Sequence, residues 1–355
     1  MKKNIDYTSY DINDIATVFI NFAENECKES SKMYFQLSHQ IAKEKQLLEI
    51  AAKTRYLQPI PNIFLAAIHF LLLKNSNEPL AEYYPTINPL ATNSEIPFPL
   101  FKSFVLENKE RIIALIQTKI VQTNVINRCA YLLPIFSAII EKEQKEVAIV
   151  DIGTSAGLTL NWDKYQYKYN SSILYGQSTV QIECEIRNSE LPTIYSINFP
   201  IEKIGVDQQL ILINDEEEQL WLKALIWADH VDRFNNISAA LRLNEQSDTK
   251  FIEAATIKDF ETILRAISKN KLLIVYATHV LYQFSEIDLI DFNKMLDSIG
   301  MERDFYFLSV EGTTLQKNKY KTSDTVVELT QYKNGIKSQK LVALTNGHGN
   351  WICWK

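Results

Sequence analysis

Glycine is scarce in this chain of 355 residues, and none occurs in the first 152 positions. All nine glycines lie at Gly153 or beyond. Tight β-hairpins need backbone positions with positive φ, which glycine occupies at the lowest cost. We therefore expect the segment before Gly153 to be helical, and apolar residues at helical spacing within residues 37–51 and 112–120 support this.

Cysteine is also rare, and its distribution excludes two kinds of small scaffold. The four cysteines lie far apart, at Cys27, Cys129, Cys184 and Cys353. They form no C-x-x-C pair, which excludes a disulfide framework and a zinc ribbon and favours a reducing compartment.

Proline is unevenly spread along the chain. Seven of the ten prolines lie between Pro59 and Pro99, and none follows Pro200. Because proline breaks a helix interior, we expect short helices and extended connectors in residues 59–99.

The chain has no hydrophobic run long enough to cross a bilayer and no excess of positive charge. Its longest apolar run, residues 63–73, is interrupted by His69, whereas a membrane-spanning helix needs about 20 residues. Polar residues follow Met1-Lys2-Lys3, so we expect no secretory signal. The net charge of −6 argues against a broad surface for nucleic acid. These features predict a cytoplasmic protein with no membrane or nucleic-acid partner, and they leave its oligomeric state open.

From residue 146 onward, short apolar runs alternate with amphipathic segments, which is typical of a parallel α/β sheet. A hairpin pattern follows, in which residues 326–332 and 341–344 flank Asn334-Gly335. Five parallel strands with a C-terminal antiparallel hairpin form the layout of a Rossmann-like class I methyltransferase sheet. We expect an all-α N-terminal domain at residues 1–118 and this α/β domain at residues 119–355. The predicted parallel strands are residues 147–152, 201–207, 251–255, 271–277 and 305–310.

The most informative stretch lies at the end of the first predicted strand and reads Asp151-Ile152-Gly153-Thr154-Ser155-Ala156-Gly157-Leu158. Gly153 allows a sharp turn, and Gly157 allows a ligand to approach the following helix closely. The stretch resembles the D/E-x-G-x-G-x-G turn by which class I methyltransferases hold S-adenosylmethionine, with Ser155 in place of the middle glycine. By this resemblance, Asp151 would contact the methionine end of the cofactor. The predicted cofactor-binding residues of this turn are Asp151, Gly153, Thr154, Ser155 and Gly157.

Other interpretations use the same residues. A dinucleotide-binding G-x-G-x-x-G turn would need glycine where Ser155 and Leu158 stand, which excludes it. Residues 153–157 also spell G-x-S-x-G, the nucleophile elbow of α/β-hydrolases, and His348 would follow in the right chain order. That fold needs strands and a glycine-rich oxyanion loop upstream, which the glycine-free first 146 residues do not offer. A structural turn that binds nothing stays open.

An acid at the end of the second strand is expected to hold the ribose hydroxyls of such a ligand. Asp207, preceded by glycine and valine, fits this position and is preferred, with residues 170–198 as an inserted hairpin or loop segment. Glu183 or Glu185 is the alternative, because both lie nearer to the glycine-containing turn along the chain.

Three further residues are candidates for substrate chemistry. His279 follows the fourth strand, where it could accept a proton from the substrate or pack beneath the next helix. Asn124 and Arg128 lie four apart before the first strand, so a helix would place them on one face as substrate-binding residues. Arg128 could bind an anionic substrate or the methionine carboxylate, or it could form a structural salt bridge. No spacing of His, Cys, Asp and Glu indicates a metal site.

Several blocks of the sequence together resemble a bacterial family filed as domain of unknown function 2332 (DUF2332). The resemblance covers about residues 30–355 and implies a methyltransferase-like fold without an established substrate. The blocks are residues 121–124, Arg128, residues 132–134 and 151–165, Gly205-Val206-Asp207, residues 221–227 and His348-Gly349-Asn350-Trp351.

We therefore expect methylation of a small-molecule substrate, with S-adenosylmethionine as the cofactor or S-adenosylhomocysteine as the bound product. One alternative is a non-enzymatic protein that binds an adenosyl ligand or nucleotide. Another is a serine hydrolase that uses Ser155.

Overall fold

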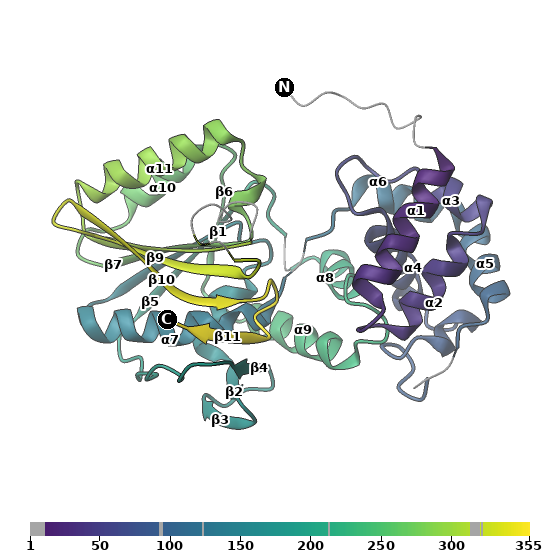
Figure 1. Ribbon diagram of the computed structural model, residues 1–355, viewed down its shortest axis with the longest axis horizontal. Helices are drawn as coiled ribbons and strands as arrows, with labels where there is room; N and C mark the ends of the chain where they lie inside the picture. The colour runs from purple at the N-terminus through teal and green to yellow at the C-terminus, as the bar shows by residue number, and fades with distance from the viewer. Residues whose placement is uncertain (1–10, 92–94, 123, 212–213, 313–319, 321) are drawn as a thin grey trace. The chain divides into compact units, whose positions relative to one another are not determined.

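The computed structural model describes residues 11–91, 95–122, 124–211, 214–312, 320 and 322–355 (Figure 1). The chain divides into two compact units, Met1–Thr123 with Asn214–Ser238 and Asn124–Ile213 with Ala239–Lys355. The sequence predicts one boundary, at residue 118, whereas the chain returns to the first unit at residues 214–238. One of the residues in the family resemblance, Thr123, lies outside the described residues.

Within its described residues, the second unit holds a mixed sheet of 11 strands in the order β3-β2-β4-β11-β10-β9-β8-β7-β1-β5-β6. Most pairings are parallel, and the antiparallel ones join β8 to β9, β9 to β10, β10 to β11 and β2 to β3. The strands are β1 Val147–Ile152, β2 Gln166–Tyr169, β3 Ser172–Tyr175, β4 Gln181–Ile186, β5 Ile201–Asp207, β6 Lys250–Glu253, β7 Leu272–Thr278, β8 Phe305–Glu311, β9 Thr325–Lys333, β10 Ile336–Thr345 and β11 Trp351–Trp354.

The five predicted parallel strands appear near their expected bounds, and β5 lies beside β1 with Val150 opposite Ile204. The hairpin also forms, because Asn334 and Gly335 both take the positive φ that its tight turn requires. The segment predicted as an insertion contributes β3 and β4, which extend the sheet beyond β11. The parallel strands are therefore close to the sequence prediction, whereas the far edge of the sheet is more extensive.

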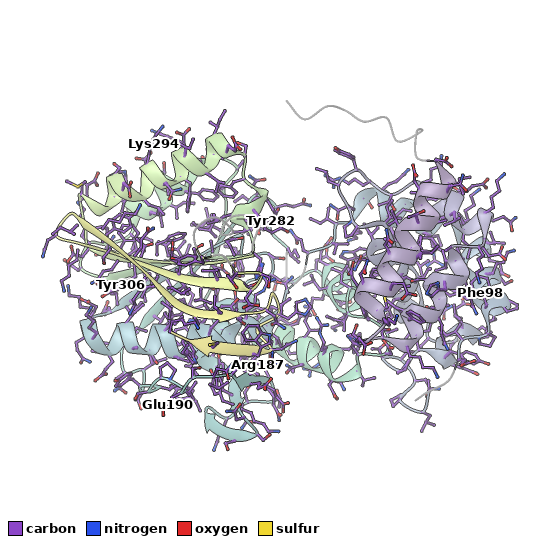
Figure 2. All side chains as sticks on the ribbon, viewed as in Figure 1. Phe98, Arg187, Glu190, Tyr282, Lys294 and Tyr306 are labelled. Carbon is purple, nitrogen blue, oxygen red and sulfur yellow. The ribbon has the colours of Figure 1, made fainter. Side chains whose placement is uncertain are left out.

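Helices cover both faces of this sheet (Figure 1). On one face, α10 Ile257–Ala266 and α11 Glu286–Gly300 share a buried core with strand residues such as Val275. Lys294 of α11 points away from the sheet (Figure 2). On the other face lies α7 Cys129–Glu143, in which the Phe136 ring lies 5.4 Å from the Tyr276 ring. Since Val275 and Tyr276 are consecutive in β7, they point to opposite faces of the sheet. The sheet is thus buried on both sides, as parallel strands require.

The first unit is helical, as its lack of glycine predicts. Prolines stand at helix starts, where their missing N–H costs no hydrogen bond: Pro59 precedes α4, Pro79 opens a 3₁₀ helix and Pro97 precedes α5. The elements are α1 Ile12–Phe22, the π-helix Ala23–Cys27, α2 Lys32–Ile41, α3 Lys45–Ala51, α4 Ile60–Lys74, the 3₁₀ helix Pro79–Tyr83, α5 Phe98–Glu107, α6 Lys109–Thr118, α8 Glu216–Ala224 and the first half of α9 Val231–Asn244.

Helix α4 forms the centre of the first unit. Its residues from 63 to 72 are all buried, so it is surrounded by other helices on every side. The same core includes Phe19 of α1, Ile112 of α6 and Trp221 of α8. Among the described helices, none is long and apolar enough to cross a membrane.

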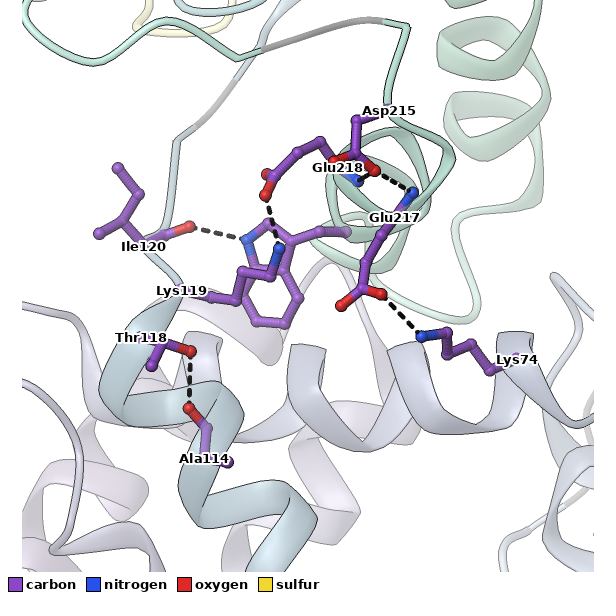
Figure 3. Close-up of polar contacts among 9 residues, drawn as sticks. Lys74, Ala114, Thr118, Lys119, Ile120, Asp215, Glu217 and Glu218 are labelled. Atoms are coloured by element: carbon purple, nitrogen blue, oxygen red, sulfur yellow. Dashed lines mark hydrogen bonds and ion pairs between the residues drawn. The ribbon is translucent and has the colours of Figure 1, made fainter.

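Helix α8 is fixed to the N-terminal helices by polar contacts as well as by this core (Figure 3). Lys74 pairs with Glu217 at 2.9 Å, and Lys119 pairs with Glu218 at 2.6 Å. The Trp221 indole N–H donates to the carbonyl oxygen of Ile120 at 2.8 Å. These contacts explain why residues 214–238 belong to the first unit although they follow β5 in the sequence.

His69 ties α4 to the end of α8 inside the first unit. Its Nδ1 lies 3.1 Å from the carbonyl oxygens of Ala224 and Ile226, and its Nε2 lies 2.8 Å from Thr86 Oγ1. The side chain is fully buried, and burial lowers the pKa of His69 from 6.5 to about 4. Both ring nitrogens have partners, so this histidine has a structural role.

The first prediction concerns acid stability. The unfolded chain binds a proton at residue 69 below about pH 6.5, whereas the folded unit binds it only below about pH 4. The stability that the neutral ring contributes is therefore complete above pH 6.5 and decreases as the pH falls toward 4, by up to about 3 kcal/mol. His69→Gln should remove this part of the acid sensitivity. Urea unfolding of the wild type and of His69→Gln, near pH 7 and near pH 4.5, tests this. If both proteins lose the same unfolding free energy between the two pH values, the prediction is wrong.

Candidate functional site

The turn after β1 contains three residues with left-handed backbone. Its φ values are +77° at Gly153, +53° at Ser155 and +70° at Gly157. Residues other than glycine rarely adopt this conformation, so Ser155 stands where glycine would be easier to accommodate. The N–H groups of Gly153 and Thr154 both donate to the carbonyl oxygen of Val206, at 2.8 and 3.2 Å. The turn is therefore fixed to β5 as well as to β1.

Close packing gives a second reason for the two glycines. A Cβ atom at Gly157 would come within 2.6 Å of the Phe251 ring, and one at Gly153 would overlap Val280. The sequence predicts that Gly157 allows a ligand to approach closely, whereas in the structure the Phe251 ring lies beside it. The protein's own side chains thus require both glycines.

Asp151 lies beneath the turn and is only 2% exposed. One of its carboxylate oxygens accepts hydrogen bonds from Thr154 Oγ1 at 3.1 Å and Thr159 Oγ1 at 2.8 Å. Burial raises the pKa of Asp151 to about 7, and the hydroxyl donors act in the opposite direction. The carboxyl group therefore connects the two ends of the turn.

Asp207 ends β5 and reaches the same turn from the next strand. Its Oδ2 accepts the Ser155 N–H at 2.8 Å, and its Oδ1 accepts the Gln209 N–H at 3.2 Å. The alternatives Glu183 and Glu185 lie on β4, which is separated from β1 in the sheet, and each pairs with a nearby cation. Of the three acids, the structure brings Asp207 to the turn.

Asn124 holds the other side of the turn. Its Nδ2 donates to Ser155 Oγ at 3.0 Å, and its Oδ1 accepts the Ala156 N–H at 3.2 Å. The predicted helix containing Asn124 and Arg128 is wrong, because α7 begins only at Cys129 and Arg128 ends a short 3₁₀ helix, Ile126–Arg128. Asn124 lies outside any helix, and its amide reaches the turn from the segment before the 3₁₀ helix.

Arg128 lies over the end of β7 rather than beside Asn124. Its Nε donates to the carbonyl oxygen of Gly347 at 3.1 Å, and its Nη1 donates to that of Thr278 at 3.2 Å. The predicted alternative, a structural salt bridge, is not present among the described residues, since both of these acceptors are neutral. The guanidinium thus joins the tip of β7 to the loop between β10 and β11.

His279 follows directly after β7 and has a left-handed backbone, with φ of +54°. Its N–H donates to the carbonyl oxygen of Val310 at 2.8 Å, while its buried Nε2 has no hydrogen-bond partner among the described residues. Burial, followed by the charge of Arg128, lowers the pKa of His279 to about 3. The imidazole is therefore neutral at physiological pH.

Glu311 is a residue that the sequence analysis missed. It ends β8 and is fully buried, and its Oε1 accepts the N–H groups of Val280 and Leu281 at 3.0 and 2.8 Å. Its Oε2 has no hydrogen-bond partner in the described chain, and burial raises the pKa of Glu311 to about 7. The available signal was an acid directly after a predicted parallel strand, the same signal that identified Asp151 and Asp207.

Within the described ranges, no group of three His, Cys, Asp or Glu residues could hold a metal ion. A cavity of about 500 Å³ lies between α7 and strands β8 to β10, and residues such as Ile135, Tyr306 and Val342 line it. None of the sequence-predicted site residues lines this cavity.

The second prediction concerns the bonds that Asn124 makes with the turn. Asn124→Ala leaves the fully buried Ala156 N–H without its acceptor, which should lower the unfolding free energy by about 1–3 kcal/mol. Asn124→Asp keeps an oxygen for that N–H and should cost less. Asn293→Ala, on the exposed side of α11, is the control and should change stability by less than about 0.5 kcal/mol. Urea unfolding of the full chain measures all three, and similar values for Asn124→Ala and the control would contradict the assignment.

Comparison with known proteins identifies the family of the chain. The family described as "Uncharacterized protein conserved in bacteria (DUF2332)" matches residues 16–354, so the chain belongs to this family. A search of curated proteins found no match to the chain.

Proposed function

We propose that this DUF2332 protein binds an adenosyl ligand at the carboxyl ends of β1 and β5 and methylates a small molecule with S-adenosylmethionine. The observation that carries the proposal is the meeting of the glycine-containing turn with Asp207, which comes from the neighbouring strand. In open α/β sheets, ligands bind outside the carboxyl ends of the strands, at the point where the strand order reverses. Here that point lies between β1 and β7.

The strand order supports a Rossmann-like class I methyltransferase sheet. Reading from β6 through β5, β1 and β7 to β8 gives the order 3-2-1-4-5 in terms of the parallel strands along the chain. This matches the first five positions of the doubly wound order. An antiparallel hairpin, β9 and β10, follows at the same side of the sheet as β8.

The residues at the turn fit an adenosyl ligand in a specific way. Each oxygen of Asp207 accepts one N–H group, and a carboxylate oxygen has two lone pairs. Each oxygen can therefore accept a ribose hydroxyl without breaking the bonds that hold the turn. Asp151, which is buried under the turn, would shape it rather than contact the methionine end of the cofactor. When bound, S-adenosylmethionine supplies a methyl group on a sulfonium centre.

The hydrolase interpretation has one observation in its favour. Ser155 has the positive φ that a nucleophile elbow imposes on its serine. In such an elbow, however, the N–H of the residue after the serine must be available to the oxyanion. Here the Ala156 N–H donates to Asn124, which also donates to Ser155 Oγ. The alternative of a non-enzymatic ligand-binding protein rests on the same turn geometry. It differs from the main proposal only in that no methyl group is transferred.

The third prediction tests ligand binding. S-adenosylhomocysteine at about 100 times its dissociation constant should stabilise the protein by about 2.7 kcal/mol, which raises Tm by about 5–10 °C. Asp207→Ala should weaken this binding about 10- to 150-fold, because it removes charge-assisted bonds of about 1.5–3 kcal/mol.

Glu183→Ala is the matched control, since it removes an exposed carboxylate from β4. Its affinity should stay within about threefold of wild type, and isothermal titration calorimetry compares the three proteins. No Tm shift at millimolar ligand would refute the proposal. If Glu183→Ala weakens ligand affinity and Asp207→Ala leaves it unchanged, Asp207 is not the acid that holds the ribose.

The fourth prediction separates a methyltransferase from a hydrolase. Ser155→Ala keeps the same backbone geometry and loses only the hydroxyl, so S-adenosylhomocysteine affinity should change by no more than a few fold. A serine nucleophile cannot be replaced in this way. Treatment with a fluorophosphonate probe followed by mass spectrometry tests the alternative. Covalent labelling of Ser155 would contradict the methyltransferase proposal and establish a serine hydrolase.

A further inference from the structure

Two buried polar atoms at the tips of neighbouring strands have no hydrogen-bond partner among the described residues. They are Nε2 of His279, after β7, and Oε2 of Glu311, at the end of β8. The two strands pair with Thr278 opposite Val310, so His279 and Glu311 occupy the next positions of adjacent strands. A buried polar atom without a partner costs about 1–3 kcal/mol, and more when it is charged. Two such atoms in adjacent positions leave room for bonds that the described residues do not supply.

The backbone holds both residues firmly in place. His279 has left-handed φ, and its N–H is bound by Val310. Glu311 uses Oε1 to bind the two N–H groups that follow His279 in the chain. Strained backbone that is held by surrounding bonds is typical of functional sites. The free oxygen of Glu311 is thus a fixed acceptor rather than a mobile side chain.

Arg128 places a positive charge beside this pair. It uses Nε and Nη1 for the carbonyl oxygens of Gly347 and Thr278, and three of its five N–H groups remain without a partner among the described residues. Its charge acts on both neighbours: it lowers the pKa of His279 and opposes the rise in the pKa of Glu311. One cation, one carboxyl group and one neutral imidazole therefore lie together.

We infer that Arg128, His279 and Glu311 form a subsite for a dipolar ligand of the amino-acid class, with an ammonium group and a carboxylate close together. The carboxylate would bind the remaining N–H groups of Arg128, which suit a planar, two-oxygen acceptor. The ammonium group would donate to Glu311 Oε2 and His279 Nε2. A lone cation would be repelled by Arg128 and a lone anion by Glu311, so neither single charge fits the whole subsite.

The same arrangement activates an amine. A proton passes from the ammonium nitrogen to Glu311: the N–H bond breaks, its electron pair stays on nitrogen and an O–H bond forms at Oε2. The nitrogen then carries the lone pair that a nucleophile needs. Binding of the dipolar ligand stands independently, whereas its role as methyl acceptor rests on the proposed function.

The fifth prediction tests the subsite with defined probes. The 20 standard L-amino acids are titrated singly up to about 10 mM into the full chain in phosphate buffer, with and without saturating S-adenosylhomocysteine. We expect saturable binding of at least one amino acid in both conditions. Methylamine and acetate, which carry one charge each, should bind at least about tenfold more weakly.

Glu311→Gln is the decisive variant, because its amide oxygen still accepts the N–H groups of Val280 and Leu281. It should weaken amino-acid binding about tenfold or more, whereas S-adenosylhomocysteine affinity stays within about threefold. Glu143→Gln is the control: Glu143 accepts the Tyr306 hydroxyl at 2.6 Å, near the opposite end of β8, and its replacement should leave amino-acid binding unchanged.

Three outcomes would overturn the inference: no saturable binding of any amino acid, equal binding by wild type and Glu311→Gln, or displacement of the amino acid by S-adenosylhomocysteine. Displacement would assign the three residues to the methionine end of the cofactor. The two proposals can fail separately. If the protein binds an amino acid through Glu311 but does not bind S-adenosylhomocysteine, the subsite is supported and the proposed cofactor is refuted.

Discussion

The left-handed turn after β1 is the constraint on which the candidate site depends. Three of its residues have positive φ, and only two of these are glycine, so the conformation must be held by its surroundings. Asn124, Asp151 and Asp207 hold it through five hydrogen bonds to its backbone and hydroxyl groups. These three side chains come from the segment before α7 and from two strands. The site therefore exists only when the sheet is assembled.

This dependence gives the acids at the strand ends different roles. Asp151 is buried, and one of its oxygens accepts two hydroxyl groups, so it stabilises the shape of the turn. Asp207 is partly exposed and keeps free lone pairs, so it can serve the turn and a ligand at once. Glu311 is buried with one oxygen free, which makes it the acid with the largest unsatisfied demand for a partner. One sequence signal, an acid at the end of a parallel strand, thus corresponds to three physical situations.

Two histidines, the buried His69 and the half-buried His279, show a similar distinction. Burial lowers the pKa of both His69 and His279, so the direction of the shift does not separate them. Their hydrogen bonds do: both ring nitrogens of His69 have partners, whereas Nε2 of His279 has none among the described residues. Packing alone explains His69. The orphaned nitrogen of His279, together with its strained backbone, requires an additional explanation, and a bound ligand provides one.

The sequence by itself determined the helical first segment, the parallel strands and the turn residues, because glycine content, hydrophobic periodicity and strand-end acids are local properties. It also identified Asp207, since a residue that ends a strand must lie at the sheet's carboxyl edge. Only the tertiary structure decided that residues 214–238 belong with the N-terminal helices, because His69 contacts Ala224, 155 positions away in the chain, and Trp221 bonds to Ile120, 101 positions away. It also decided the role of Asn124, whose amide reaches the turn from outside any helix. The sequence shows Glu311 only as another acid at a strand end, because its burial and its unpaired oxygen depend on every element packed around it.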